Sequence, residues 1–191
     1  MNFKKLEIEG AWLAESPIWE DSRGQFHEWF KFNEIKEATG FDFSVSQSNI
    51  SLSSKGTLRG IHFSLANNGQ AKWITCITGQ IVDVVVDIRP NSISYKKSKI
   101  IHLRGGDGRS VFIGPGLGHA FLSLEDDSIV AYLLDSPYSP EEEFEINPFD
   151  KDLNINWPLE LIGSNELILS HKDAIAGALT ELYSLGKLPN N

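Results

Sequence analysis

The feature that most constrains the fold is a series of short strand-forming segments in the middle of the chain, with no helical pattern between them. The segments are rich in β-branched and aromatic residues, and turns that contain glycine or acidic residues separate them. Strands are predicted over residues 45–51, 72–78, 81–88, 95–103, 110–113, 120–124 and 128–134. Short strands at regular spacing are typical of an antiparallel sandwich or barrel. We therefore predict an all-β fold.

Helical patterns occur only toward the two ends of the chain. Residues 31–39, followed by Gly40, predict a short N-terminal helix that ends at the glycine. Residues 171–185 predict a C-terminal helix, with Ser170 as its N-cap and Asp173 three positions later. Residues 1–20 are interpreted as an extended arm. No linker, charge block or repeat divides the chain, so a single domain over residues 1–191 is expected.

Composition argues against several classes of protein. The net charge of -9 disfavours non-specific nucleic-acid binding, which needs a broad basic surface. The single cysteine, Cys76, cannot form an internal disulfide, which favours a reducing compartment. The first residues lack the apolar core of a signal peptide, and no apolar run approaches the roughly 20 residues that span a bilayer. We expect a cytoplasmic protein that binds neither nucleic acid nor membrane.

Residues 58–63 carry the densest group of chemically active side chains. Arg59 and His62 flank Gly60, and Lys72 follows in the same apolar, strand-forming region. Charged groups are costly to bury there unless they have partners or a ligand. Gly60 is interpreted as part of a turn that brings the three side chains together. The pattern predicts a pocket for an anionic ligand, in which a proton is transferred.

His62 and His119 lie beside glycines within apolar segments. Two interpretations stay open for them: hydrogen-bonded core residues, or metal ligands, because residues 115–119 resemble the second metal motif of the cupins. The first cupin motif has two histidines one residue apart with a glutamate soon after, whereas Phe63 and Ser64 follow His62 here. Two isolated histidines do not complete a three-ligand site, so no metal is expected.

Six segments, in order along the chain, resemble the signature segments of the dTDP-4-dehydrorhamnose 3,5-epimerases. They are residues 21–28 (DSRGQFHE), 47–51 (QSNIS), 58–63 (LRGIHF), 79–89 (GQIVDVVVDIR), 116–121 (GLGHAF) and 155–158 (INWP). The resemblance extends from about residue 6 to about residue 180. It implies a cupin-type jelly roll, usually a homodimer, that works without a metal or an organic cofactor. Residues 1–20 would then be an arm exchanged between subunits.

The resemblance also implies a reaction on a dTDP-linked 4-keto-6-deoxy sugar. A hydrogen next to the C4 ketone is acidic because its removal gives an enolate. Epimerisation at C3 and C5 therefore needs a base on one face, a proton donor on the other, and a cation near the enolate oxygen. By the resemblance, His62 is the base and Asp173 orients it. Tyr132 donates the proton, and Lys72 stabilises the enolate. The implied substrate-binding residues are Arg23, Phe26, Glu28, Gln47, Asn49, Arg59, His119, Tyr138, Glu143 and Lys172.

Several of these residues also fit a plainer role. Asp173 fits the capping box of the last helix, and Tyr132 fits a strand aromatic that packs on the core. Lys72 and Arg59 suit edge strands, where charges discourage aggregation. Phe26 matches a nucleoside-contacting position of the family, but its aromatic neighbours favour packing in the core or in a dimer interface.

Departures from the family's pattern leave the substrate open. Ser64 stands where the family usually has glutamine, and Leu133 stands where it usually has lysine. Residues 148–150 read Pro-Phe-Asp in place of Trp-Asn-Asp. These changes are similar to a branch of the family in which some members invert a single carbon. Double epimerisation at C3 and C5 is the main hypothesis. A single-site epimerase of a deoxy- or aminosugar and a non-catalytic nucleotide-sugar-binding cupin are the alternatives.

Overall fold

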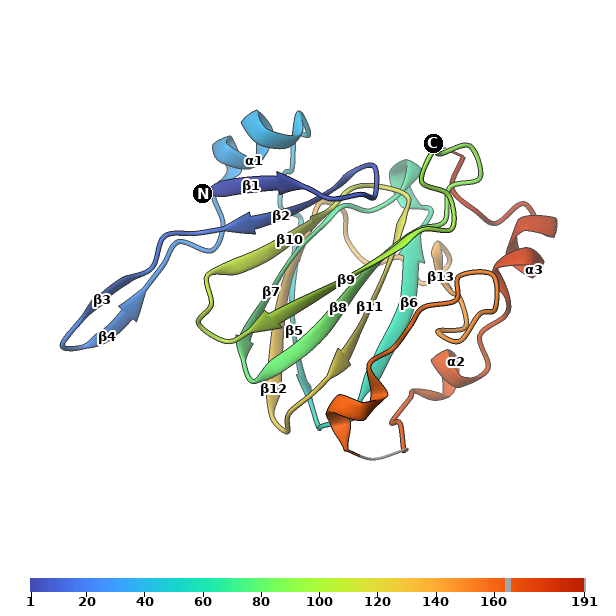
Figure 1. The fold of residues 1–191 in the computed structure, drawn as a ribbon. Helices are drawn as coiled ribbons and strands as arrows, with labels where there is room; N and C mark the ends of the chain where they lie inside the picture. The colour runs from blue at the N-terminus through green and yellow to red at the C-terminus, as the bar shows by residue number, and fades with distance from the viewer. Residues whose placement is uncertain (164–165, 191) are drawn as a thin grey trace.

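The structure, a computed structural model, describes residues 1–163 and 166–190 as an antiparallel β sandwich (Figure 1). The all-β prediction is confirmed. The strands are β1 (Asn2–Lys5), β2 (Ala11–Glu15), β3 (Trp19–Asp21), β4 (Gly24–Phe26), β5 (Gln47–Ser53), β6 (Leu58–Ser64), β7 (Lys72–Thr78), β8 (Gln80–Asp87), β9 (Ser98–Arg104), β10 (Arg109–Ile113), β11 (Leu117–Ser123), β12 (Ser128–Leu134) and β13 (Glu143–Glu145). The α-helices are α1 (Phe32–Thr39), α2 (His171–Ala174) and α3 (Leu179–Ser184).

Two sheets form the sandwich. The larger has six strands in the order β1-β2-β10-β7-β12-β5, and the other has five in the order β13-β6-β11-β8-β9. Consecutive strands such as β7 and β8 lie in different sheets, so the chain crosses repeatedly between them, as in a jelly roll. The remaining pair, β3 and β4, forms a hairpin that projects away from the sandwich (Figure 1).

Alternation along the strands builds apolar clusters on three surfaces. Val85 points between the sheets, whereas its neighbour Val84 packs on the outer face of the five-stranded sheet. The chain after residue 146 covers that outer face (Figure 1). On the outer face of the six-stranded sheet, Ile35 of α1 joins a cluster around Trp73. Strand β8 is buried on both faces, and its sequence is accordingly mostly apolar, with four valines in eight residues.

Two predicted features of the strands are wrong. Gly60 is not in a turn, because residues 58–64 form the continuous strand β6. The strand predicted from residue 95 begins only at Ser98. Hydrogen-bonded turns precede it, and Lys96 has a left-handed φ of 66°. The short strands β1 to β4 and β13 lack a strong pattern of their own, and pairing with neighbouring strands keeps them extended.

The single helix predicted over residues 171–185 is also wrong, because α2 and α3 are separated by a non-helical segment. The Gly177 carbonyl of that segment accepts a hydrogen bond from the backbone N–H of Asn147, at 2.9 Å. The Asp150 carboxylate then accepts the Leu179 N–H at 2.9 Å, at the start of α3. These tertiary hydrogen bonds replace the bonds that a continuous helix would make.

The N-terminal arm differs from the expectation as well. The first fifteen residues include β1 and β2, which pair within the six-stranded sheet of the same chain. The part that projects is the β3–β4 hairpin (Figure 1). Its Trp19 and Phe26 rings lie 5.9 Å apart and are 50% and 64% exposed. The extended arm is therefore residues 19–26.

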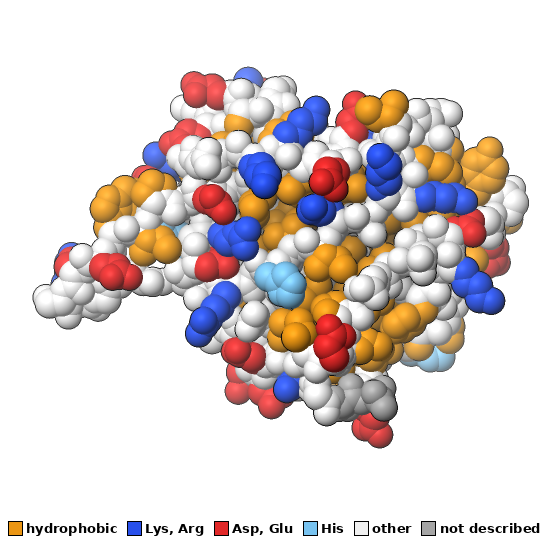
Figure 2. Space-filling view, viewed as in Figure 1, with side chains coloured by type: hydrophobic (Ala, Val, Ile, Leu, Met, Phe, Trp, Pro, Cys, Tyr) orange, Lys and Arg blue, Asp and Glu red, His pale blue; other side chains and the backbone are white. Residues whose placement is uncertain are grey.

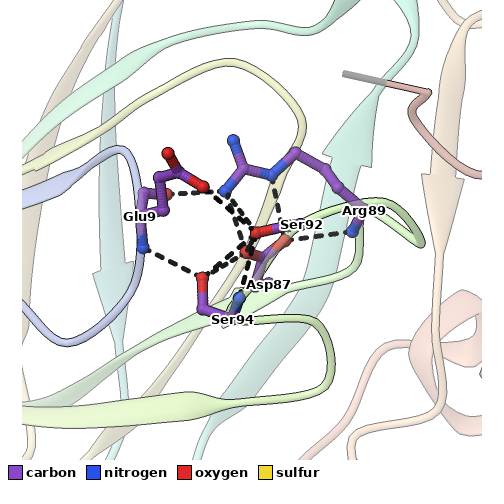
Figure 3. Close-up of polar contacts among 5 residues, drawn as sticks. All are labelled: Glu9, Asp87, Arg89, Ser92 and Ser94. Atoms are coloured by element: carbon purple, nitrogen blue, oxygen red, sulfur yellow. Dashed lines mark hydrogen bonds and ion pairs between the residues drawn. The ribbon is translucent and has the colours of Figure 1, made fainter.

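A buried polar network joins the β1–β2 loop to the β8–β9 connection (Figure 3). The fully buried Asp87 carboxylate accepts bonds from Arg89, at 2.8 and 2.9 Å, and from the hydroxyls of Ser92 and Ser94. Arg89 also donates to the Glu9 carbonyl at 2.7 Å. Burial would raise the pKa of the Asp87 carboxyl, but these hydrogen bonds outweigh burial and hold the pKa below its usual value.

Candidate active site

A cavity of about 280 Å³ opens between the two sheets, on the side where β5 and β13 are the edge strands. It brings together most of the residues predicted to act on a ligand. The lining residues are Gln47, Asn49, Arg59, His62, Gln70, Lys72, Tyr132, Leu134, Tyr138, Glu143, Phe144, Glu145, Ser170, Lys172 and Asp173.

Strand register in the six-stranded sheet builds one wall of the cavity. Tyr132 on β12 lies opposite Asn49 on β5. Two residues further along β12, Leu134 lies opposite both Gln47 on β5 and Lys72 on β7. Directly opposed residues share a face of a sheet, and so do residues two apart on one strand. All five side chains therefore point to the interior.

An irregularity in β6 shapes the opposite wall. His62 pairs with His119 on β11, whereas Arg59 pairs with Phe121, so β6 carries one extra residue. Regular alternation would put residues 59 and 62 on opposite faces, but this β-bulge lets both line the cavity. Gly60 suits the bulge because its φ is 109° and an added Cβ would lie 2.5 Å from the His119 carbonyl oxygen.

A buried carboxylate holds His62. Its Nε2 lies 2.6 Å from Oδ1 of Asp173, which α2 supplies and which is 2% exposed. Burial would raise the pKa of Asp173, but hydrogen bonds, first of all from His62, keep the pKa below its usual value. An ionised carboxylate only accepts hydrogen bonds, so Nε2 of His62 is the donor, and in the neutral ring the lone pair then lies on Nδ1. The N-cap of α2 is Ser170, whose hydroxyl accepts the Asp173 N–H at 3.1 Å.

Lys72 is the buried cation of the cavity, with 6% of its surface exposed. Burial lowers the pKa of its ammonium group, and the carboxylates of Glu143 and Asp83 act in the opposite direction. Within the described part of the chain, Oε1 of Glu143 is buried without a hydrogen-bond partner. Buried polar groups of this kind gain from the polar atoms of a ligand.

His119, which the resemblance places in contact with the substrate, is not among the residues that line the cavity. It is the cross-strand neighbour of His62, is 9% exposed, and its Nε2 lies 2.6 Å from Oδ1 of Asp83. Sequence reasoning did not select Asp83 as a site residue. The sequence did contain a signal for Asp83, because it is an acidic residue within the valine-rich β8. A carboxylate is costly to bury there unless it has a hydrogen-bonding partner.

Hydrogen bonds order the rim of the cavity. Gln47 donates to Asn49 Oδ1 at 2.9 Å and accepts the Tyr138 backbone N–H at 2.8 Å. Lys172 forms an ion pair with Glu145 at 2.9 Å. The rim therefore presents amide groups, a phenol and a cation to the solvent, which suits a polar ligand with negative charge.

Besides His119, three residues predicted to bind substrate do not line the cavity of their own chain. Arg23 lies in the turn of the β3–β4 hairpin, where its side chain is 88% exposed and pairs with Asp21. Phe26 lies on the same hairpin. Glu28 follows it and pairs with Lys31 at 3.1 Å. The hairpin projects away from the sandwich in Figure 1.

Some lining residues were missed in the sequence. Leu134 could have been found by strand alternation, because it lies two residues from Tyr132 on a predicted strand. Gln70, Glu145 and Ser170 also lie two residues from predicted site residues, but outside the predicted strands, and Phe144 carries no such signal. The departures noted in the sequence, at Ser64, Leu133 and residues 148–150, are not among the lining residues, and Leu133 packs on the outer face of its sheet.

The arrangement suits proton transfer. His62, backed by a carboxylate, and Tyr132 come from different sheets, and a buried ammonium lines the same cavity. Among residues 1–163 and 166–190, no group of three or more His, Cys, Asp or Glu residues could hold a metal ion. No helix in these ranges is long and apolar enough to cross a membrane.

Comparisons with known proteins agree with this geometry. A family model described as dTDP-4-dehydrorhamnose 3,5-epimerase matches residues 5–181. A dTDP-4-dehydrorhamnose 3,5-epimerase of Mycolicibacterium smegmatis is 43% identical over 99% of this chain and 91% of its own length. The structure of the RmlC epimerase of Mycobacterium tuberculosis is similar, with a TM-score of 0.95 and 38% identity over 99% of this chain and 94% of that one. ChmJ, a 3'-monoepimerase from Streptomyces bikiniensis in complex with dTDP-quinovose, has a TM-score of 0.90 and 42% identity over 96% of this chain and 91% of its own.

Proposed function

This chain belongs to the dTDP-4-dehydrorhamnose 3,5-epimerase family of isomerases, and we propose that it inverts C3 and C5 of a dTDP-linked 4-keto-6-deoxy sugar. The observation that carries the proposal is the His62–Asp173 pair, at 2.6 Å, in one cavity with Tyr132 from the other sheet. A base and an acid on opposite walls are what epimerisation requires, because the proton leaves one face of the carbon and returns to the other.

In the proposed mechanism, Nδ1 of His62 takes the hydrogen from the carbon next to the C4 ketone. Asp173 then stabilises the imidazolium that forms, through the bond it already makes to Nε2. The electron pair moves onto the C4 oxygen as an enolate, and the buried Lys72 stabilises that charge. Tyr132 returns a proton to the opposite face. His62 releases its proton to solvent and the tyrosinate regains one, so no metal or organic cofactor takes part in the proposed step.

The rest of the cavity suits the nucleotide. Arg59 offers a guanidinium group for the pyrophosphate oxygens, which it can bind in bidentate fashion. Gln47, Asn49 and Tyr138 offer hydrogen-bonding groups at the rim, with Lys172 as a further cation. These groups explain how an acidic chain can hold an anionic substrate.

We also propose that the active form is a homodimer in which each β3–β4 hairpin completes the cavity of the other subunit. Arg23 and Phe26 are too exposed, and too remote from their own cavity, to bind substrate within one chain. The edge strand β5 exposes Ile50 and Leu52 on the outer face of the six-stranded sheet, at 76% and 60%. Apolar surface on an edge strand is typically covered by a partner.

Solvent exchange tests the proposed reaction. Proton NMR of dTDP-4-keto-6-deoxy-D-glucose with the protein in heavy water should show loss of signal at both C3 and C5. His62→Ala should slow exchange by about 10²- to 10⁴-fold, the usual contribution of a general base. Tyr132→Phe should still allow removal of a proton but should impair formation of the inverted product. Exchange unchanged in His62→Ala would exclude this base.

A single-site epimerase is the second candidate, favoured by the 42% identity to the 3'-monoepimerase ChmJ. Exchange at C3 alone, with C5 unlabelled after complete turnover of C3, would establish it and exclude the double reaction. Binding of dTDP without any exchange would favour a non-catalytic nucleotide-sugar-binding protein.

A further inference from the structure

A second cavity, of about 330 Å³, lies at the other open side of the sandwich, between β1 and β2 of one sheet and β9 of the other. It shares no lining residue with the active-site cavity. Figure 2 shows Lys and Arg side chains around a strip of hydrophobic atoms on the face that carries β9. The lining residues are Lys4, Lys5, Leu6, Glu7, Leu13, Lys99, Ile100, Ile101, His102 and Arg109.

Three of the cations point into the space between the sheets. Lys4 lies opposite Leu13, and Leu13 belongs to the apolar cluster between the sheets. Arg109 is two residues from Val111, and Lys99 is two residues from Ile101, both members of the same cluster. Residues that share a register position or lie two apart on a strand share a face, so all three cations point inward.

The charge of this cavity is opposite to that of the chain. Its lining includes four Lys and Arg residues and one acidic residue, Glu7, whereas the chain as a whole has 17 basic and 26 acidic residues. In a protein with a net charge of -9, such a local excess of cations gives a site that attracts anions.

The cations are only partly neutralised by protein groups. Lys99 lies 3.5 Å from Glu7, and Arg109 lies 3.5 Å from Glu15, both longer than a normal charged hydrogen bond. Arg109 also donates to the His102 carbonyl at 3.0 Å, which holds its guanidinium between the two sheets. The side chain of Lys4 makes no hydrogen bond or ion pair within residues 1–163 and 166–190.

We propose that this second cavity binds a small organic phosphate. Lys4, Lys99 and Arg109 would contact the phosphate oxygens, because a phosphate is the dianion that best matches several cations at once. The apolar floor formed by Leu13 and Ile101, which are 7% and 5% exposed, would contact the rest of the molecule. This site is separate from the proposed epimerase reaction and does not depend on it.

The competing explanation is protection of the sheet edges. β1 and β9 are edge strands, and inward-pointing charges on edge strands discourage pairing between molecules. That role needs no ligand, and it predicts no saturable binding of a phosphate at this side of the sandwich.

Equilibrium dialysis with phenyl phosphate at low ionic strength separates the two explanations, with uncharged phenol as the comparison probe. The proposal expects saturable binding of phenyl phosphate and not of phenol. The double variant Lys4→Ala/Lys99→Ala should weaken that binding at least about tenfold, and added salt should weaken it further. The control variant Lys36→Ala, which removes an exposed lysine on α1, should leave binding unchanged.

Arg59→Ala distinguishes this site from the active-site cavity, because Arg59 lines only the other side of the sandwich. Binding that persists in Arg59→Ala and is lost in Lys4→Ala/Lys99→Ala supports the proposal. Binding that is lost in Arg59→Ala but kept in the double variant overturns it. Absence of saturable binding up to about 10 mM overturns it too, since affinity weaker than that corresponds to less than about 3 kcal/mol.

Discussion

At the scale of single residues, the proposed chemistry depends on one hydrogen bond. The Asp173 carboxylate is buried, ionised and 2.6 Å from Nε2 of His62. It therefore sets which ring nitrogen of His62 carries the hydrogen, and it stabilises the imidazolium after proton abstraction. Neither effect requires Asp173 to touch the substrate, so in the proposed mechanism it is a positioning residue.

Asp173→Asn should lower kcat by about 10²- to 10⁴-fold, because an amide neither fixes this tautomer nor stabilises the imidazolium. The measurement is the rate of solvent deuterium incorporation, with the Kd for dTDP as the control. We expect that Kd to stay within about threefold of wild type, since His62 and Asp173 act on the sugar and not on the nucleotide. Loss of dTDP binding in parallel with kcat would indicate a structural role instead.

At the scale of elements, two loops are joined by the network around Asp87 and Arg89 (Figure 3). Asp87 is fully buried and receives two bonds from Arg89, so removal of its charge leaves a guanidinium group poorly paired in a mostly buried site. Breaking a buried pair from one side commonly costs about 3 to 5 kcal/mol. The network therefore contributes to the stability of the sandwich at the end where β1–β2 meets β8–β9.

Asp87→Asn should lower the free energy of unfolding by about 3 kcal/mol at pH 7, measured by urea denaturation. The pKa of Asp87 is depressed in the folded state, so its contribution is present above the unfolded pKa of about 4 and is lost as the pH falls through the folded value. The difference between wild type and variant should therefore shrink below about pH 4. Asp152→Asn is the control: its pair with Lys96 is exposed and should contribute less than about 1 kcal/mol. Equal effects of the two substitutions would contradict the assignment.

At the scale of the whole molecule, the proposed dimer places residues of two chains in each site. Mixing two inactive variants can test this directly. Chains with Arg23→Ala and Phe26→Ala keep an intact cavity, and chains with His62→Ala keep an intact hairpin. If the hairpin serves the other subunit, random mixing and re-association should restore about a quarter of wild-type activity, because half the molecules are mixed dimers with one complete site each.

The control mixture combines His62→Ala with Tyr132→Phe. Both substitutions lie in the cavity wall of a single chain, so mixed dimers contain no complete site and activity should stay low. Activity restored in the control mixture would contradict the proposed arrangement. So would a lack of restored activity in the mixture of hairpin variant and His62→Ala, provided that the mixed protein is dimeric.

Much of the architecture could be predicted because it depends on local pattern. Strand alternation and turns predict most of the sandwich, and the buried valines of β8 follow from its sequence. His62, Lys72 and Tyr132 all line the cavity. The cost of burying charge singles out His62 and Lys72 in a single sequence, whereas Tyr132 was selected only from the family resemblance.

Other features were decided only by tertiary contacts. The Asp150 and Asn147 hydrogen bonds interrupt the predicted C-terminal helix, although the local sequence favours its continuation. Strict alternation would put Arg59 and His62 on opposite faces of the sheet, but the bulge at Gly60 turns both toward the same cavity. The bulge arises because β6 has one more residue than β11 between the two paired positions. The sequence by itself determined which residues form strands and which charges are candidates for a site. Only the packing of distant segments decided where helices stop and which way a side chain points, because those outcomes depend on hydrogen bonds between residues far apart in the chain.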